Sequence, residues 1–226
     1  SKLLNLESTG FLKSFEIAIQ LGAILSVAVL YWRSLLIDLK SLSRVFTAFI
    51  PTALLGAFFY KCIKNYLLNS EVIVLIALFV GGIVLILFEL FHREKAESNM
   101  EVADISYKQA FIIGTCQALA IVPGVSRSLA TILGGLALGL RRKTIVQFSF
   151  LLAIPTMLSA SAYDLMKSAA HFTLAQFNYL AIGFIVSFIV ALMSIRFLLS
   201  YIEKHNFLIF GVYRIIVSLF FQQKIR

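Results

Sequence analysis

Long apolar runs separated by short polar stretches dominate the pattern of this chain. Six runs are long enough to suggest membrane-spanning helices: 15–32, 45–60, 72–91, 145–163, 177–199 and 207–221. A helix needs roughly 20 residues to cross the hydrocarbon core of a bilayer. Two shorter apolar segments, 110–122 and 129–140, lie between the third and fourth runs. Segments of about a dozen residues cannot cross alone, so this part of the pattern predicts a re-entrant pair that meets inside the membrane.

The predicted fold class is all-α, a polytopic membrane protein with about six full transmembrane helices plus a re-entrant helix pair. The composition agrees, because 60% of the residues are hydrophobic and the mean hydropathy is +0.94. The net charge of +9 does not indicate a nucleic-acid-binding protein, since the basic residues separate apolar runs and form no contiguous face. The lipid bilayer is the expected partner. The positive-inside rule favours the side that carries Arg33 and Arg141–Lys143 as cytoplasmic.

The chain is predicted to be one integral membrane domain, 1–226, built from two related halves. A polar stretch, 92–107, separates the remainder of a first repeat (1–91) from a second repeat (108–226). The segment that begins at Phe15 can be laid over the one that begins at Phe148, with Gly22 and Pro155 at the same place. Inverted repeats with broken helices are a recurrent membrane architecture. The same alignment puts the first copy of the broken helix before Ser1, so we expect that an N-terminal piece precedes this sequence.

The most informative motif is Pro-Gly-Val-Ser-Arg-Ser at 123–128, with Thr131 one turn later. Pro-Gly ends one helical segment and leaves free backbone N–H groups at the start of the next. An arginine within membrane-like sequence is costly and indicates a functional site. A helix N-terminus, an arginine and hydroxyl groups together favour an anion, and phosphate is the natural ligand. The motif therefore predicts a membrane protein that handles a phosphorylated lipid.

Each residue of the motif has a functional and a structural interpretation. Arg127 would clamp phosphate oxygens and stabilise charge on the transferred group, or it would pair with a helix C-terminus or with Glu16. Ser126, Ser128 and Thr131 would bind phosphate oxygens, or they would cap the second short helix. Gly124 would let the backbone approach the phosphate, and Pro123 would set the break.

Three polar residues outside the motif have the same two interpretations. Gln117 would face the cavity or bridge helices. Glu16 would position metal or water at the mouth of the site, or it would be an interfacial acid. The position of Arg214 within the last apolar run favours a structural ion pair or a contact with a lipid headgroup. No metal-ligand spacing is present, so the sequence leaves the metal ligands unknown.

The residues at 117–131 resemble the second signature of the bacterial undecaprenyl-diphosphate phosphatases, the bacitracin-resistance family. The segments 15–22 and 148–155 and the pair Tyr213-Arg214 are also similar to that family. The resemblance implies hydrolysis of undecaprenyl diphosphate to undecaprenyl phosphate and phosphate, which recycles the lipid carrier of peptidoglycan synthesis and confers bacitracin resistance. It also implies a divalent cation, Mg or Ca, and a multi-pass location in the bacterial plasma (inner) membrane.

Only the second half of the family's active site carries over to residues of this sequence. We expect catalytic roles for Arg127 and Ser126, and substrate contacts from Pro123, Gly124, Ser128, Thr131, Gln117 and Glu16. No histidine or lysine base lies in the same element as Ser126, so a nucleophilic role for that serine is not favoured. The family's first signature, paired acidic or amide residues followed by Ser-Ser-x-x-His, is missing here. The attacking group of the family is thought to lie in that signature.

Two other functions stay open at this point. A transporter or flippase for an anionic or lipid-phosphate substrate would use the same broken helices and arginine without hydrolysis. A truncated family member without activity is the second alternative, because half of the expected site is missing.

Overall fold

The computed structural model describes residues 10–36, 38–62, 71–92, 100–167, 174–202 and 205–225. These residues are helical almost throughout and contain no strand, which confirms the predicted all-α class. The α-helices are α1 (Gly10–Leu30), α2 (Trp32–Leu36), α3 (Leu39–Cys62), α4 (Glu71–Phe91), α5 (Tyr107–Ala118), α6 (Arg127–Ala137), α7 (Arg142–Lys167), α8 (Leu174–Ile202) and α9 (Leu208–Ile225). Two short 3₁₀ turns, η3 (Val102–Asp104) and η4 (Leu119–Ile121), precede and follow α5.

Four of the described helices are long and apolar enough to cross a membrane. They contain the segments Leu39–Phe59, Val72–Phe91, Arg142–Ala162 and Phe177–Ile202. Two shorter apolar stretches, Ser14–Leu30 in α1 and Leu208–Gln222 in α9, coincide with the remaining two predicted runs. The protein is therefore a multi-pass membrane protein, and five of the six predicted runs each coincide with one helix, whereas the first, 15–32, extends past the end of α1.

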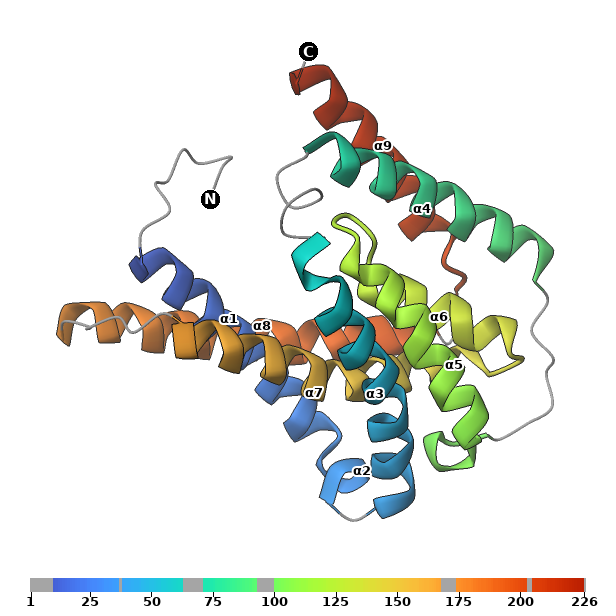
Figure 1. The fold of residues 1–226 in the computed structure, drawn as a ribbon, viewed down its shortest axis with the longest axis horizontal. Helices are drawn as coiled ribbons and strands as arrows, with labels where there is room; N and C mark the ends of the chain where they lie inside the picture. Colours follow the sequence, from blue (N-terminus) through green and yellow to red (C-terminus); the bar gives the residue numbers. More distant parts are fainter. Residues whose placement is uncertain are drawn as a thin grey trace.

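Figure 1 shows three groups of helices. On one side α1 lies along α8, on the other side α4 lies along α9, and α3, α5, α6 and α7 form the centre. At the alignment of Phe15 with Phe148, α1 overlaps α7, α3 overlaps α8 and α4 overlaps α9; the internal repeat stays a prediction. The short pair α5–α6 packs against α3 and α7, which places the Pro-Gly break beside long helices.

The buried core surrounds the α5–α6 pair. Most of its fully buried side chains come from α5, α6, α7 and the segments beside them, with Val45 added from α3, and they include Ile105, Ile113, Leu136, Ile145 and Phe148. Large apolar side chains elsewhere point outward, as at Phe58, Phe197 and Phe220. This distribution suits a protein whose outer surface faces lipid rather than water.

Helix α5 approaches α3 unusually closely at Gly114. A Cβ atom at this position would overlap the backbone of Ala48, so only glycine fits. The Thr52 hydroxyl on α3 donates a 2.8 Å hydrogen bond to the Gly114 carbonyl oxygen. Small residues at a crossing let membrane helices pack backbone to backbone. This contact fixes α5, the first of the two short helices around the Pro-Gly break, against a long helix.

The structure differs from the predicted pattern in two places. The first helix ends at Leu30 rather than Trp32, and a turn at Tyr31 leads into the separate helix α2. Part of the predicted polar stretch is not solvated, because Val102 and Ile105 are buried. A hydrogen bond of 2.8 Å from Arg44 Nε to the Ile105 carbonyl oxygen holds this segment against α3. Two apolar residues within a charged stretch are therefore enough to anchor it.

Candidate active site

The Pro-Gly break lies where the motif predicts it. Helix α5 and the turn η4 end at Ile121, and α6 begins at Arg127. Gly124 has a φ of +90°, a backbone conformation that costs side-chain-bearing residues energy. A Cβ atom there would also overlap the carbonyl oxygen of Val74 on α4. Glycine is thus required twice, for its backbone conformation and for the close approach of α4.

Ser126 is the N-cap of α6. Its Oγ accepts a 3.3 Å hydrogen bond from the Leu129 amide, and it lies 3.0 Å from the Oγ of Ser128. The capping interpretation of Ser126 therefore holds in this structure. Capping with Ser126 orders the start of an 11-residue helix, whose first N–H groups have no partner within the helix. The hydroxyl pair and these N–H groups form a compact set of donors for an anion.

Arg127, the first residue of α6, directs its guanidinium group toward α7. Its Nη1 donates to Thr156 Oγ1 at 2.6 Å, and its Nη2 lies 3.5 Å from the Met157 sulfur. A thioether is a weak acceptor, and a guanidinium group carries five N–H donors. Among the described residues no carboxylate pairs with Arg127, so neither Glu16 nor another acid neutralises it there. A partly buried cation that is this poorly compensated favours an anionic ligand.

Thr131 and Gln117 form an internal polar chain that joins three helices. The Thr131 hydroxyl lies 3.2 Å from Gln117 Oε1 and 2.8 Å from the Arg127 carbonyl oxygen. Gln117 Nε2 donates to Thr52 Oγ1 on α3 at 3.3 Å. Thr131 and Gln117 are both buried. In this structure they bridge α3, α5 and α6, and they act on the site by holding the two short helices in register.

Arg214 on α9 contacts the break itself. Its Nη2 donates to the Gly124 carbonyl oxygen at 3.0 Å and lies 3.5 Å from the carbonyl oxygen of Ala77 on α4. These partners are backbone oxygens rather than the acid of an ion pair. The sequence marks Arg214 only as an arginine within an apolar run. Its contact with a residue 90 positions earlier depends on the packing of α9 and could not be read from the pattern.

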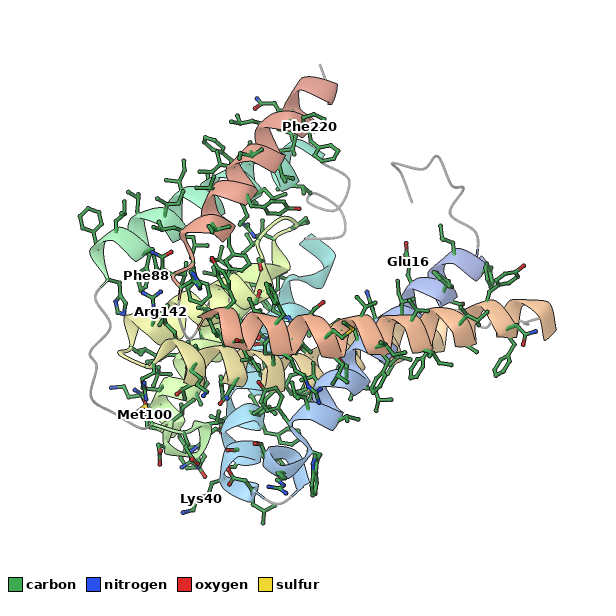
Figure 2. The ribbon with its side chains drawn as sticks, turned by 180° about the vertical axis from the view of Figure 1, so that it is seen from behind. Glu16, Lys40, Phe88, Met100, Arg142 and Phe220 are labelled. Atoms are coloured by element: carbon green, nitrogen blue, oxygen red, sulfur yellow. The ribbon has the colours of Figure 1, made fainter. Side chains whose placement is uncertain are left out.

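Glu16 lies apart from the other candidate residues. Figure 2 places it on the part of α1 that is distant from α5 and α6, and its side chain is exposed. The structure thus brings Pro123, Gly124, Ser126, Arg127 and Ser128 together at one break, with Thr131 and Gln117 behind them, and leaves Glu16 outside this group.

Sequence reasoning missed Thr156 as the partner of Arg127. The available signal was a hydroxyl that directly follows a proline within an apolar run, Pro155-Thr156. Thr156 also donates back to the Leu152 carbonyl oxygen at 2.8 Å, which explains how its Oγ is held in place. Polar side chains beside a proline in a membrane helix commonly satisfy backbone groups that the proline frees.

The donors at the break fit an anion and do not fit a divalent cation. They are two guanidinium groups, hydroxyls, an amide and backbone N–H groups, and none of them carries negative charge. Mg²⁺ and Ca²⁺ prefer carboxylate and carbonyl oxygens. Within the described residues no three His, Cys, Asp or Glu side chains lie close enough to hold a metal.

Comparisons with known proteins indicate one family over nearly the whole chain. The family described as Bacitracin resistance protein BacA matches residues 1–220. The undecaprenyl-diphosphatase of Aquifex aeolicus is 46% identical over 217 residues, which cover 96% of this chain and 84% of the relative. The protein of the same name from a Sulfurihydrogenibium species is 47% identical over 221 residues, 98% of this chain and 86% of the relative. One from Campylobacter jejuni is 46% identical over 220 residues, 97% of this chain and 82% of the relative.

Proposed function

The chain belongs to the bacitracin resistance protein BacA family, and from this membership and the geometry of the break we propose that it hydrolyses undecaprenyl diphosphate. The products would be undecaprenyl phosphate and inorganic phosphate. The reaction would take place in the bacterial plasma membrane, where it returns the lipid carrier to peptidoglycan synthesis. Removal of the diphosphate that bacitracin sequesters would explain resistance to that antibiotic.

The observation that carries this proposal is the uncompensated Arg127 at the start of α6. Among the described residues, its side-chain partners are the Thr156 hydroxyl and the Met157 sulfur, neither of which is charged. The α6 N-terminus adds backbone N–H groups and the positive end of the helix dipole. A terminal phosphate placed here would receive charge-assisted hydrogen bonds from both. The same groups stabilise the negative charge that develops on the equatorial oxygens as the phosphoryl group is transferred.

In the net reaction the bond between the terminal phosphorus and the bridging oxygen breaks. Undecaprenyl phosphate keeps the electron pair of that bond, a water oxygen forms the new bond to phosphorus, and a proton is released to solvent. Arg127 and the helix start bind and orient the terminal phosphate in this scheme. Ser126 binds rather than attacks in this scheme, because no histidine or lysine base lies in its element and its Oγ caps the helix through the Leu129 amide.

Dependence on Mg²⁺ or Ca²⁺ stays part of the proposal, although the described residues of the break supply no anionic ligand for such an ion. The polar chain through Thr131 and Gln117 supports the site from behind, since it ties α6 to α3 and α5. Pro123 and Gly124 set the path of the backbone into the helix start.

The direct test is release of inorganic phosphate from undecaprenyl diphosphate by the purified protein in detergent, with and without added Mg²⁺, Ca²⁺ or a chelator. Hydrolysis that depends on the protein supports the proposal. The transporter alternative makes a different prediction, uptake of labelled phosphate or lipid phosphate into sealed vesicles without hydrolysis. Uptake in the absence of any phosphate release would overturn the proposed function in favour of transport.

A further inference from the structure

A cavity of about 300 Å³ lies on the Arg214 side of the break. Its polar lining comes from α6, α7 and α9, and consists chiefly of Ser126, Ser128, Ser149 and Arg214. The rest of the lining is apolar, and Leu129, Ile132, Phe150 and Phe210 are typical members. Its volume is at the lower end of the range for ligand pockets in proteins, about 300–1,000 Å³. An apolar pocket with a cation and hydroxyls among its lining residues suits an amphipathic anion.

Arg214 has more hydrogen-bonding capacity than its protein contacts use. Nη2 donates to the Gly124 carbonyl oxygen at 3.0 Å, whereas Nε is buried and has no hydrogen-bond partner among the residues that the structure describes. A buried donor without a partner is costly, and so is a guanidinium group with no counter-charge within an apolar helix. Gly81 on α4 leaves room for this group, because a Cβ there would lie 2.7 Å from Nη2. The described residues around Arg214 thus leave room for its guanidinium group without neutralising its charge.

The two arginines of the break differ in what they face. Arg127 is directed to Thr156 on α7 and does not line the cavity. Arg214 lines the cavity together with Ser126 and Ser128, the two residues that flank Arg127 in the sequence. A diphosphate bound at the start of α6 presents two phosphates, of which only one is attached to the lipid. Two cations in separate places match two phosphates that belong to different products after hydrolysis.

We propose that this cavity holds the phosphate that stays on the lipid together with the first isoprene units. Arg214 contacts the lipid-proximal phosphate, Ser128 and Ser126 lie beside it, and the apolar walls cover the start of the hydrocarbon chain. Arg127 and the α6 N-terminus then contact the terminal phosphate that leaves. This assignment rests on the proposed function for the identity of the lipid, and it makes undecaprenyl phosphate, the product, a ligand of the Arg214 side alone.

Binding of the product tests the assignment without requiring hydrolysis. Radiolabelled undecaprenyl phosphate is titrated into the purified protein in phospholipid-free detergent micelles, and the dissociation constant is measured for each variant. Arg214→Gln should weaken binding at least about tenfold, the effect of losing a charge-assisted hydrogen bond. Arg127→Gln should bind close to wild type, because the product lacks the phosphate that Arg127 contacts. Arg196→Gln, a change of an exposed arginine on α8, is the matched control and should bind as wild type.

Arg214→Gln could also disturb the fold, since Arg214 donates to the Gly124 carbonyl oxygen. A second variant therefore tests the cavity without changing Arg214. Ser149→Leu places a larger side chain at a buried wall of the cavity and leaves both arginines in place, and it should also lose product binding. Wild-type affinity in both Arg214→Gln and Ser149→Leu would overturn the assignment. An equal loss in Arg127→Gln and Arg214→Gln would overturn it too, because the two cations would then serve one phosphate.

A phospholipid headgroup offers the same chemistry, a phosphate on an apolar tail, so phosphatidylglycerol is added as a competitor. Displacement of undecaprenyl phosphate by phosphatidylglycerol at equal concentration would contradict the assignment to substrate, and the absence of displacement supports it. Failure of the proposed function has a different signature. In that case the wild-type protein would release no phosphate from undecaprenyl diphosphate, while the pattern of product binding among the variants would be unchanged.

Discussion

Arg214 on α9 donates a 3.0 Å hydrogen bond to the carbonyl oxygen of Gly124, although the two residues are 90 positions apart in the sequence. Helix α4 closes on the same turn through Val74 and Ala77. The break between α5 and α6 is therefore held by two helices that lie along each other outside the central group (Figure 1). The geometry of the proposed phosphate site therefore depends on the packing of α4 and α9 as well as on the motif.

Gly124→Ala should lower both stability and activity. A residue with a side chain at a φ of +90° costs about 1–2 kcal/mol, and its Cβ would in addition overlap the Val74 carbonyl oxygen. Thermal unfolding in detergent and the rate of phosphate release measure the two effects. Gly139→Ala is the matched control, because Gly139 has a φ of +80° with open space around it. Equal effects of the two substitutions would show that the approach of α4 to Gly124 is unimportant.

Gly114→Ala should force α3 and α5 apart. The added methyl group would overlap the Ala48 backbone, and the expected destabilisation is about 1–3 kcal/mol, as for other overpacked positions. The Thr52 bonds to Gly114 and Gln117 would lengthen with it, so phosphate release should fall as well. Gly56→Ala on α3 is the control, since nothing lies near its Cβ position. That change should stabilise the protein slightly through helix propensity, and an equal loss of thermal stability in both variants would refute the explanation.

Glu89→Ala should destabilise the protein by about 3–5 kcal/mol, because it removes the acid of a largely buried ion pair with Arg142. Glu89 lies near the end of α4 and is buried, and its ion pair with Arg142 joins α4 to the start of α7. Within the described part of the chain, both carboxylate oxygens otherwise lack hydrogen-bond partners. The double variant Glu89→Leu with Arg142→Met should lose less stability than either single change. Additive losses in thermal unfolding would indicate that the pair does not act as a unit.

Thr131→Val should reduce phosphate release severalfold and stability by about 1–3 kcal/mol. The substitution keeps the shape of the side chain but leaves the Oε1 of buried Gln117 without its donor. Thr115→Val is the control and should change little, because this threonine is exposed on α5 and its hydroxyl donates to the Phe111 carbonyl oxygen of its own helix. If Thr131→Val behaves like Thr115→Val in both assays, the polar chain does not support the site.

Local chemistry explains which features of the site the sequence predicted. Pro123 and Gly124 end one helix and Ser126 caps the next, so the break and the first turn of α6 follow from neighbouring residues. Long apolar runs likewise predicted the six main helices. The partners of the charged groups depend on distant helices instead. Nothing in the pattern joins Arg127 to Thr156 or Arg214 to Gly124.

The burial of Ile105 likewise could not be predicted from the sequence pattern. A charged stretch predicts a solvated loop, but Ile105 is fully buried in the core around α5 and Arg44 binds its carbonyl oxygen from α3. Hydrophobic periodicity detects elements long enough to show a repeat, and a three-residue turn such as η3 is too short for one.

The central claim is that Arg127 binds the terminal phosphate and stabilises its transfer. Its most direct test is kcat/KM for phosphate release from undecaprenyl diphosphate by Arg127→Lys, compared with Arg196→Lys on the exposed face of α8. We expect Arg127→Lys to lose about 100-fold or more, the usual effect of removing one preorganised donor, while Arg196→Lys stays near wild type. A folded Arg127→Lys variant that releases phosphate at the wild-type rate would contradict the account.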